Sequence, residues 1–342
     1  MSYDYQASCT KTLEFEGSEV EFVDSSHRPE HGDVVAVKVK ELQGDYTELD
    51  MEGAETVELS EGDVFIGAFG NRSALKGYVG EVPDKVSVGQ ELALIGAGGI
   101  VGDYISKTNE YGPPVVLEFL GYVEKDGSLL NTEAHGVRPA ERIENDVPTL
   151  AVVATRMEAG KTTLASNIIG QLDDEGYDVA SLKLTGSGNE RDRMSMFEAG
   201  SEVSHDFVDA GLVTTVTERR DVVSRARALI SEVSGVDVDV LVVEFGAGLI
   251  SPYGGATVMR DMEVRTAIDA VVGVAITVPG AEGLRRELDG MYYDLLSISG
   301  PITDTSTGQR KTEEVVGLPS YNAFDEDDVE ELTGLVKHQL DI

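Results

Sequence analysis

The stretch that decides the fold is TLAVVATRMEAGKTTLASNIIGQLDDEG, residues 149 to 176. It begins with an apolar run of the kind found in a buried strand, and the part after Gly160 has the pattern of a helix that ends at Gly176. The short loop between them closes with Gly160, Lys161 and Thr162. A strand, a loop of this kind and a helix in this order predict a phosphate-binding turn.

The loop departs from the usual phosphate-binding pattern by one residue. That pattern has a glycine, four residues and then Gly-Lys-Ser/Thr, but Thr155 occupies the place of the first glycine. Counting one residue further back reaches Ala154, which leaves five residues before Gly160. The chemistry does not depend on this count, because N–H groups at the start of a helix bind phosphate in either case. The alternative is a helix start that binds no ligand.

The polar groups of the loop have expected roles. Lys161 can reach the β- and γ-phosphate oxygens of a nucleotide, and the Thr162 hydroxyl can coordinate Mg²⁺. We expect the loop and the first helical turn to bind nucleotide through Thr155, Glu158, Ala159, Gly160, Lys161, Thr162 and Thr163.

Apolar strand runs and helical stretches alternate along the rest of the carboxy-terminal half. Further strands are expected at residues 177–184, 238–245 and 269–278, with helices between and after them. Such alternation is typical of a parallel sheet covered by helices on both faces. The sequence therefore predicts an α/β P-loop NTPase domain over residues 149–342. DEDDVEEL at 325–332 suits the acidic start of its last helix.

The amino-terminal part has a different pattern. Short strands separated by turns are expected at residues 33–40, 54–60, 63–70, 91–96 and 113–123. This spacing predicts a β-rich barrel or sandwich domain over residues 1–123. GAGGIVG at 96–102 is expected to be a tight turn, because its third glycine is misplaced for dinucleotide binding and no helix follows. Residues 124–148 have few apolar residues and no clear period, so we expect a linker there.

Charge is the most unusual global property of the 342 residues. Asp and Glu number 63 against 27 Lys and Arg, which gives a formal net charge of −36. We expect a solvated surface adapted to a salty cytoplasm, as in halophiles, and the alternative is an acidic face that meets a basic partner. We expect no nucleic-acid partner, because general affinity for DNA or RNA depends on neutralising phosphates with Lys and Arg.

Other features narrow the class of protein further. No apolar stretch reaches the roughly 18 residues of a membrane span, and the first 17 residues lack the regions of a signal peptide. We therefore expect a cytoplasmic chain without a membrane partner. The single Cys9 cannot form an intramolecular disulfide or anchor a multi-cysteine zinc site. The five histidines have no metal-ligand spacing, and we interpret them as structural or surface residues.

The segment ATRMEAGKTTLASNIIGQLDDEGYDVASLKLTGSG, residues 154 to 188, resembles the start of the dethiobiotin synthetases. Their loop has the longer spacing Gly-Thr-x-x-Glu-x-Gly-Lys-Thr, followed by a helix, a strand and Lys-Pro-x-x-x-Gly. The resemblance implies that Lys183 lies at the substrate, because it falls where that family keeps a lysine. The residues that match the loop motif are Thr155, Glu158, Gly160, Lys161 and Thr162. The departures from the family are Ala154, Arg156, Met157 and Leu184.

A second match is VLVVEFGAGLISPYGG, residues 240 to 255. It resembles the Glu-Gly-Ala-Gly-Gly segment of dethiobiotin synthetases and the Glu-Gly-Gln-Gly-Ser-Leu-x-His-Pro segment of the DUF1611 family, which includes D-glutamate N-acetyltransferases. An acidic residue that ends a buried strand near such a loop is suited to hold Mg²⁺, so we expect Glu244 to take that role. Gly246 and Gly248 would let backbone approach the substrate or the γ-phosphate. The alternative is a strand-to-loop turn with an exposed glutamate.

The region between these two matches supplies candidates for a second metal contact. KLTGSGNERDRMSMFEAGSEVSHDFVDAG, residues 183 to 211, is similar to the Thr-Gly and Asp-Phe-Val pieces of DUF1611 proteins. Asp192 and Asp206 are the candidates, and the alternative for each is a solvated acidic residue. The resemblance covers roughly residues 149–280, and the β-rich amino-terminal half is not part of a dethiobiotin synthetase.

The leading functional hypothesis is an enzyme that uses Mg²⁺ and ATP to activate a small carboxylate, amine or carbamate. Lys161, Lys183 and Glu244 are its expected catalytic residues, and phosphoryl transfer would give ligase-type chemistry. ATP is favoured over GTP, because the guanine signature Asn/Thr-Lys-x-Asp does not follow the loop. The alternatives are a nucleotide-switched binding protein and a DUF1611-like acyltransferase. The expected partners are the nucleotide and a small-molecule substrate, and a homodimer is left open.

Overall fold

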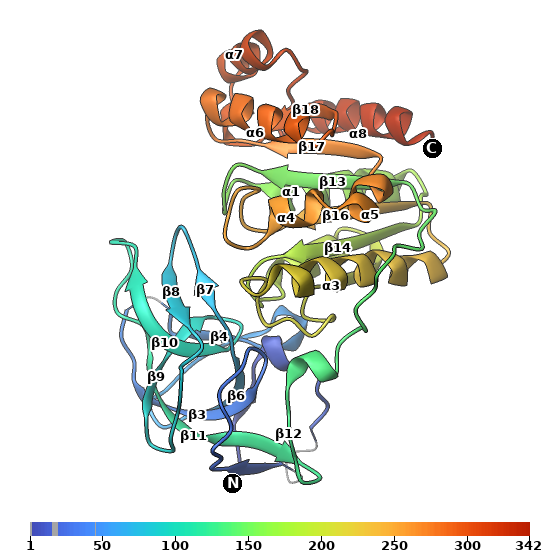
Figure 1. Cartoon of the computed structure of the whole chain (residues 1–342). Helices are drawn as coiled ribbons and strands as arrows, with labels where there is room; N and C mark the ends of the chain where they lie inside the picture. The colour runs from blue at the N-terminus through green and yellow to red at the C-terminus, as the bar shows by residue number, and fades with distance from the viewer. Residues whose placement is uncertain (1, 16–19, 45) are drawn as a thin grey trace. The chain divides into compact units, whose positions relative to one another are not determined.

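The computed structural model describes residues 2–15, 20–44 and 46–342. The chain folds into two compact units (Figure 1). The barrel unit contains the chain up to Arg138 together with Ser187–Arg191 and Phe207–Glu218. The α/β unit contains Pro139–Gly186, Asp192–Asp206 and Arg219–Ile342. The barrel unit thus takes in two short segments of the carboxy-terminal half. The limits of 1–123, 124–148 and 149–342 remain predictions from the sequence.

Six parallel strands form the sheet of the α/β unit: β13 (Thr149–Ala154), β14 (Val179–Thr185), β15 (Ser201–Asp206), β16 (Val240–Phe245), β17 (Ala270–Val274) and β18 (Leu295–Ser299). Their order across the sheet is β15-β14-β16-β13-β17-β18. Every residue of β13, β14, β16 and β17 is buried, which explains the nearly continuous apolar runs of β13, β16 and β17. The predicted parallel α/β fold is confirmed.

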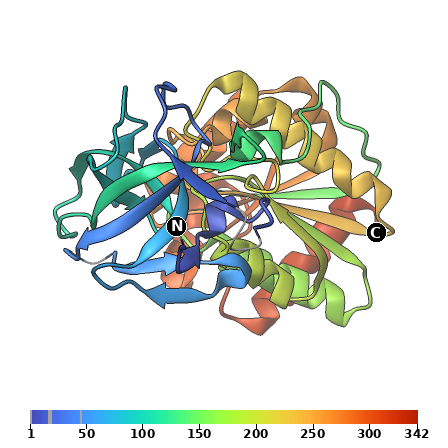
Figure 2. The same ribbon diagram turned by 90° about the horizontal axis from the view of Figure 1, so that it is seen from below.

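Eight helices follow or connect these strands in the described chain: α1 (Lys161–Asp174), α2 (Arg191–Glu198), α3 (Arg219–Glu232), α4 (Gly255–Met259), α5 (Met262–Ala267), α6 (Val278–Gly290), α7 (Ser306–Val316) and α8 (Glu326–Leu340). Figure 2 shows helices on both faces of the sheet. On one face α1 packs against α8, and on the other α3 packs against α4 and α5.

The buried faces of α1 and α8 explain why these two helices meet. Leu164, Ile168 and Leu172 recur every four residues along α1, and they share a core with Leu332 and Val336 of α8. The acidic start predicted for the last helix is confirmed, since α8 carries three acidic residues in its first turn. α1 is therefore fixed by packing against α8 and the sheet.

The barrel unit contains β1 (Tyr5–Gln6), β2 (Glu21–Val23), β3 (Val34–Glu41), β6 (Val64–Phe69), β7 (Arg72–Ser73), β8 (Tyr78–Glu81), β9 (Glu91–Gly96), β10 (Ile100–Lys107), β11 (Val116–Lys125) and β12 (Ser128–Leu129), with β4 (Glu48–Asp50) and β5 (Thr56–Glu58) as a separate pair. The pairing runs β6-β3-β11-β9-β10, and β10 pairs in turn with β6. Five strands therefore close a ring. Of the two predicted alternatives, the β-rich domain is a barrel.

The glycine run at residues 96–102 contains a turn, as predicted. β9 ends at Gly96, β10 begins at Ile100, and the two strands pair antiparallel. β10 itself is not among the predicted strands. Its second half is largely exposed and mixes polar residues with Tyr104 and Ile105, so it lacks the apolar run that identified the other strands.

Two segments of the carboxy-terminal half belong to the barrel unit. Ser187–Arg191 follows β14, and Phe207–Glu218 follows β15. Within the barrel unit the Gly188 N–H donates to the Val213 carbonyl oxygen at 3.0 Å. The Thr132 hydroxyl donates to the Gly211 carbonyl oxygen at 2.8 Å. These contacts join residues that are distant in sequence and use backbone carbonyl groups, so no sequence motif predicts them.

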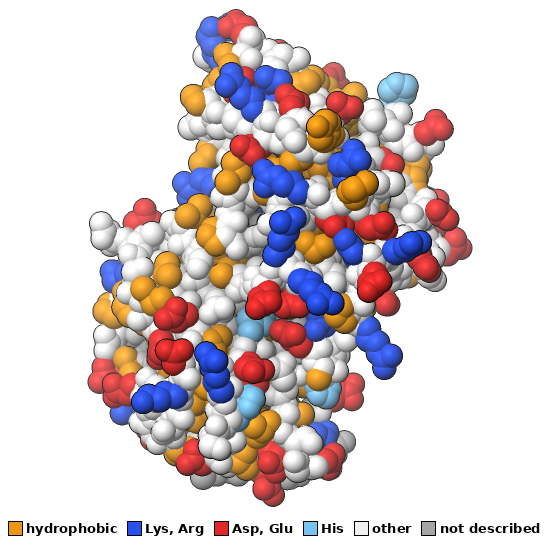
Figure 3. Space-filling view, viewed as in Figure 1, with side chains coloured by type: hydrophobic (Ala, Val, Ile, Leu, Met, Phe, Trp, Pro, Cys, Tyr) orange, Lys and Arg blue, Asp and Glu red, His pale blue; other side chains and the backbone are white. Residues whose placement is uncertain are grey.

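The surface mixes both signs of charge. On the face shown in Figure 3, acidic and basic side chains are interspersed with smaller apolar areas. Within residues 2–15, 20–44 and 46–342, no helix has the length and apolar character needed to cross a bilayer.

We expect the melting temperature of the protein to rise steeply between about 0.1 M and 2 M KCl. The formal net charge of −36 opposes compaction at low salt. The screening length falls from roughly 10 Å at 0.1 M to about 3 Å at 1 M, so this repulsion is largely removed. Exposed ion pairs such as Lys40 with Glu91 weaken over the same range, but such pairs contribute little.

Thermal melting followed by circular dichroism measures this effect. Sucrose at matched osmolality controls for general stabilisation by cosolutes. A melting temperature that stays flat across the KCl series would contradict the interpretation of salt adaptation and favour a basic partner.

Candidate functional site

The loop between β13 and α1 has left-handed backbone at two positions. These are Glu158, with φ of 57°, and Gly160, with φ of 98°. Neither Ala154 nor Thr155 has positive φ among the described residues. A side chain is therefore tolerated where the usual phosphate-binding pattern has its first glycine, while the glycine next to Lys161 is needed for its conformation. This accounts for the one-residue departure from the pattern.

The start of α1 offers unused hydrogen-bond donors. Its first helical bond runs from the Leu164 N–H to the Gly160 carbonyl oxygen at 3.0 Å. Within the described part of the chain, the backbone N–H groups of Gly160, Lys161, Thr162 and Thr163 donate to no protein acceptor. The first turn contains no acidic side chain. Four such donors at the positive end of a helix dipole favour an anion.

The Thr155 hydroxyl is a further unused polar group at this loop. Its oxygen is buried and has no hydrogen-bond partner among the described residues. The backbone N–H of Thr155 donates to the Val274 carbonyl oxygen at 3.0 Å, which fixes the start of the loop to β17. Buried hydroxyl groups are rarely left unsatisfied, so this oxygen supports a polar ligand at the loop.

Lys161 is the first residue of α1 and is only 5% exposed. Its Nζ donates to the Ala247 carbonyl oxygen at 2.6 Å and to the Arg156 carbonyl oxygen at 3.4 Å. Burial lowers the pKa of Lys161, and the charges of Glu244 and Asp192 oppose this only in part. A buried ammonium held by neutral carbonyl groups gains when an anion replaces them.

Three charged side chains lie in one register row across the sheet. Glu244 of β16 is in register with Val152 of β13 and Lys183 of β14, and Lys183 is in register with Asp206 of β15. Their exposed fractions are 1% for Glu244, 3% for Lys183 and 0% for Asp206. Such residues are almost never fully buried unless they are paired, so this alternation of sign marks the carboxyl edge of the sheet as a candidate site.

Glu244 connects this row to the loop between β13 and α1. The Thr162 hydroxyl donates to Glu244 Oε2 at 2.8 Å. Burial raises the pKa of Glu244, the charge of Asp192 raises it further, and Lys161, Lys183 and the Thr162 hydroxyl lower it in part. The site therefore resists negative charge on this carboxylate unless a cation is added.

Lys183 forms an ion pair with Asp192, which lies in the first turn of α2. Burial alone would lower the pKa of Lys183, but the charges of Asp192 and Glu244 outweigh burial and raise it. For Asp192 burial would raise the pKa, and the Lys183 ammonium outweighs it, so the pKa lies below its ordinary value. Both groups are therefore charged near neutral pH.

Two glycines allow the segment after β16 to approach other backbone. A Cβ atom on Gly246 would lie 1.9 Å from the Thr185 carbonyl oxygen, and one on Gly248 would lie 2.8 Å from the Cα atom of Arg156. The Leu249 N–H also donates to the Ala154 carbonyl oxygen at 2.8 Å. This segment is therefore held directly against the loop between β13 and α1, and no larger residue fits at Gly246.

The structure brings most of the predicted residues to one place. Thr162 contacts Glu244 and also lowers the pKa of Asp192 by hydrogen bonding, whereas Asp206 lies beyond Lys183 in the register row. Of the two candidates for a second metal contact, Asp192 is thus the one beside the loop. Of the remaining loop residues, the side chain of Glu158 is exposed, Ala159 is buried and Thr163 is half-buried.

Ala247 belongs to the site but is not among the predicted site residues. Its carbonyl oxygen accepts the hydrogen bond from Lys161, and its backbone is left-handed with φ of 61°. A backbone contact requires no particular side chain, so the identity of residue 247 does not predict this hydrogen bond. Among the described residues no three His, Cys, Asp or Glu side chains gather as a metal cluster.

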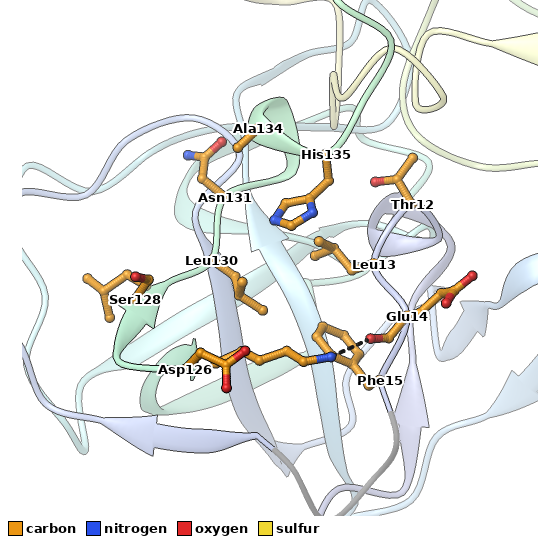
Figure 4. A pocket seen from close by; sticks show the side chains of 12 residues that line it. Thr12, Leu13, Glu14, Phe15, Asp126, Ser128, Leu130, Asn131, Ala134 and His135 are labelled. Carbon is orange, nitrogen blue, oxygen red and sulfur yellow. Dashed lines mark hydrogen bonds between the residues drawn. The ribbon is translucent and has the colours of Figure 1, made fainter.

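A separate hollow of about 640 Å³ lies in the barrel unit (Figure 4). Its volume is in the range of small-molecule pockets. Its charged groups have both signs, and Lys125 Nζ donates to the Glu14 carbonyl oxygen at 3.4 Å. The lining residues are Thr12, Leu13, Glu14, Phe15, Lys125, Asp126, Ser128, Leu129, Leu130, Asn131, Ala134 and His135.

No protein-family model matches the chain, and no curated protein matches it. Solved structures with partial similarity include a DUF1611 family protein from Anabaena variabilis, with TM-score 0.41 and 12% identity over 59% of this chain and 63% of that one. A ParA family ATPase from Chlorobium tepidum has TM-score 0.33 and 16% identity over 58% of this chain and 98% of that one. Chloroplast FtsY from Physcomitrella patens has TM-score 0.39 and 16% identity over 60% and 68%. This chain thus spans less than two thirds of the DUF1611 protein.

Proposed function

We propose that this protein binds a nucleoside triphosphate with Mg²⁺ and transfers its γ-phosphoryl group to a small carboxylate or carbamate. The observation that carries the proposal is the convergence of Lys161, Thr162, Glu244 and Lys183 beside the unused N–H donors of α1. Two buried cations and a row of backbone donors form a polar site at the carboxyl edge of a parallel sheet, where ligands bind in such folds.

Phosphate binding is assigned to the loop and to Lys161. The N–H groups from Gly160 to Thr163 would hold the β- and γ-phosphates, and the Thr155 hydroxyl would find its partner there. Lys161 would exchange the carbonyl of Ala247 for a phosphate oxygen. Its charge then stabilises the negative charge that moves onto the leaving phosphate during transfer.

The metal assignment depends on donor chemistry. Thr162 Oγ1 and Glu244 Oε2 lie 2.8 Å apart, and both are hard oxygen donors of the kind Mg²⁺ prefers. When bound, Mg²⁺ would neutralise charge on the β- and γ-phosphates. Burial raises the pKa of Glu244, so a neighbouring cation would favour its ionised form. Asp192, held beside Thr162, is the candidate for a second contact.

Lys183 would hold the acceptor. Its ammonium is buried and charged, and it lies at the carboxyl edge of the sheet beside Glu244. A carboxylate or carbamate oxygen would attack the γ-phosphorus, the bond from this phosphorus to the β–γ bridging oxygen would break, and ADP would leave with the electron pair. The product is a mixed phosphate anhydride, which a nucleophile can capture in ligase chemistry. The resemblance of residues 154–188 to dethiobiotin synthetases supports this assignment.

The test is incubation with ATP or GTP and Mg²⁺ across a panel of small carboxylates, amines and carbamates, with ADP or GDP release as the readout. We expect ATP to be used, release to depend on one acceptor class, and EDTA to abolish it. Slow hydrolysis that no acceptor stimulates would contradict the proposal and favour a nucleotide-switched binding protein. Absence of hydrolysis together with binding of coenzyme A would favour an acyltransferase.

A further inference from the structure

The barrel unit contains a buried arginine at the start of a short hairpin. Arg72 begins β7, which pairs with β8, and β8 pairs with β10 (Figure 1). Only 5% of the residue is exposed. We propose that Arg72 and the hydroxyl group of Tyr46 bind a small monovalent anion, of which chloride is the abundant example. Both residues belong to the barrel unit, and the proposal is independent of the nucleotide chemistry.

The positive charge of Arg72 is not balanced by the described residues. A guanidinium has five N–H donors. Nη1 donates to the Ile95 carbonyl oxygen at 2.5 Å, whereas Nε is buried and has no hydrogen-bond partner in the described chain. No described carboxylate forms an ion pair with Arg72. A buried charge is costly unless it is paired, so a negative charge is expected beside this side chain.

Aromatic rings fix the position of the guanidinium without neutralising it. The Cζ atom of Arg72 lies 5.4 Å from the centre of the Tyr46 ring. The rings of Tyr78 and Tyr111 lie 5.0 Å and 5.2 Å from that of Tyr46, between centroids. A cation–π contact returns less free energy than the burial of an ion costs. The tyrosines therefore orient Arg72, and its charge still needs a counterion.

Two unused donors meet beside Gly77. A Cβ atom on Gly77 would lie 3.1 Å from Arg72 Nη2 and 3.6 Å from Tyr46 Oη, with no closer contact outside its own stretch of backbone. Among the described residues, neither Nη2 nor this Oη donates to a protein acceptor. The Thr108 hydroxyl lies at the same place, because its oxygen accepts from the Gly77 N–H at 3.3 Å. The φ of Gly77 is 113°, so the position favours glycine and the space beside the donors stays open.

The surroundings select the class of anion. One guanidinium balances one negative charge, and a multivalent anion such as phosphate would lose more hydration than a single arginine returns. Because Arg72 is almost fully covered, a bulky ligand has no access to its guanidinium. The edges of aromatic rings carry partial positive charge and tolerate an anion of low hydration. A halide therefore fits the donors, the charge and the apolar walls together.

Chloride-35 NMR line broadening tests the proposal directly. We expect the wild-type protein to broaden the chloride signal in a saturable manner that bromide competes away, and Arg72→Met to lose this component. Tyr46→Phe keeps the ring over the guanidinium and removes only the hydroxyl, so it should weaken chloride binding by about tenfold. Tyr104→Phe is the matched control, because Tyr104 contacts the same cluster through Tyr78 but is 41% exposed. It should leave the affinity unchanged.

A second readout is thermal melting in KCl and in potassium gluconate at equal ionic strength, which separates binding from charge screening. With chloride about tenfold above its Kd, the folding equilibrium gains about elevenfold, and the melting temperature should be higher in KCl by roughly 3–6 °C. Arg72→Met should lose this excess, because it lacks the charge that the anion balances.

Crystals soaked in bromide locate the site. We expect an anomalous peak within hydrogen-bonding distance of Arg72 Nη2 and Tyr46 Oη. Bromide only at other positions, or equal chloride broadening by the wild type and Tyr46→Phe, would overturn the proposal. If Arg72→Met failed to fold, the contrast between Tyr46→Phe and Tyr104→Phe would still decide it.

Discussion

Lys161→Ala should lower triphosphate turnover by a factor of at least about 10², which corresponds to roughly 3 kcal/mol of lost transition-state stabilisation. The ammonium is buried at the start of α1 and is held by the carbonyl groups of Ala247 and Arg156. Without this ammonium, the phosphate charges would face only backbone dipoles and the Mg²⁺ that Thr162 and Glu244 are proposed to hold. Steady-state ADP release measures the loss of turnover, and nucleotide titration by calorimetry measures the loss of affinity.

Folding should survive this substitution. The hydrogen-bond partners of Lys161 Nζ are carbonyl oxygens, so its removal leaves no buried carboxylate without a hydrogen-bonded cation. Circular dichroism checks that the fold persists. Lys311→Ala is the control, because Lys311 is an exposed lysine of α7 paired with Glu314. If Lys161→Ala bound nucleotide with unchanged affinity and retained full turnover, the assignment of the loop would be wrong.

Gly246→Ala should destabilise the α/β unit and, at the same time, lower triphosphate turnover at its candidate site. The added Cβ atom would lie 1.9 Å from the Thr185 carbonyl oxygen, which is backbone and cannot rotate away. β14 and β16 would have to separate at the point where Lys183 and Glu244 lie in register. We expect a loss of about 3 kcal/mol and a fall in melting temperature of roughly 6–12 °C.

A glycine of the same unit provides a control of opposite sign. Gly283 lies within α6, and a Cβ atom there would meet nothing within 4 Å. Gly283→Ala should therefore stabilise the protein by about 0.5–1 kcal/mol, because alanine loses less backbone entropy in a helix. Calorimetric melting of both variants in the same buffer measures the contrast. Equal melting of Gly246→Ala and the wild type would mean that the close approach is absent.

The sequence predicts the parts of the fold that depend on local pattern. The apolar runs of β13, β14 and β16 and the loop before Lys161 identified the parallel sheet, because strands buried on both faces need nearly continuous apolar residues. The proximity of Thr162 and Glu244 is also predictable, because the carboxyl ends of parallel strands lie at one edge of the sheet. Roles such as metal binding remain predictions.

Other parts of the site depend on contacts that no local pattern contains. Lys183 and Asp192 were assigned to the substrate and to a metal, and their ion pair comes from the path of the chain between β14 and α2. The hydrogen bond from Lys161 to Ala247 involves a carbonyl group, which every residue has. The register row of Glu244, Lys183 and Asp206 requires the strand order, and sequence alone does not fix that order.

The two late segments of the barrel unit, Ser187–Arg191 and Phe207–Glu218, determine when this unit can fold during synthesis. The chain passes between the units five times, at residues 138, 186, 191, 206 and 218. During synthesis the barrel strands emerge first, but Glu190 and Asp209, which pair with Lys11, emerge only after β13 and β14. We infer that the barrel stays incomplete until residue 218 has left the ribosome, and that no single cut can release either unit whole.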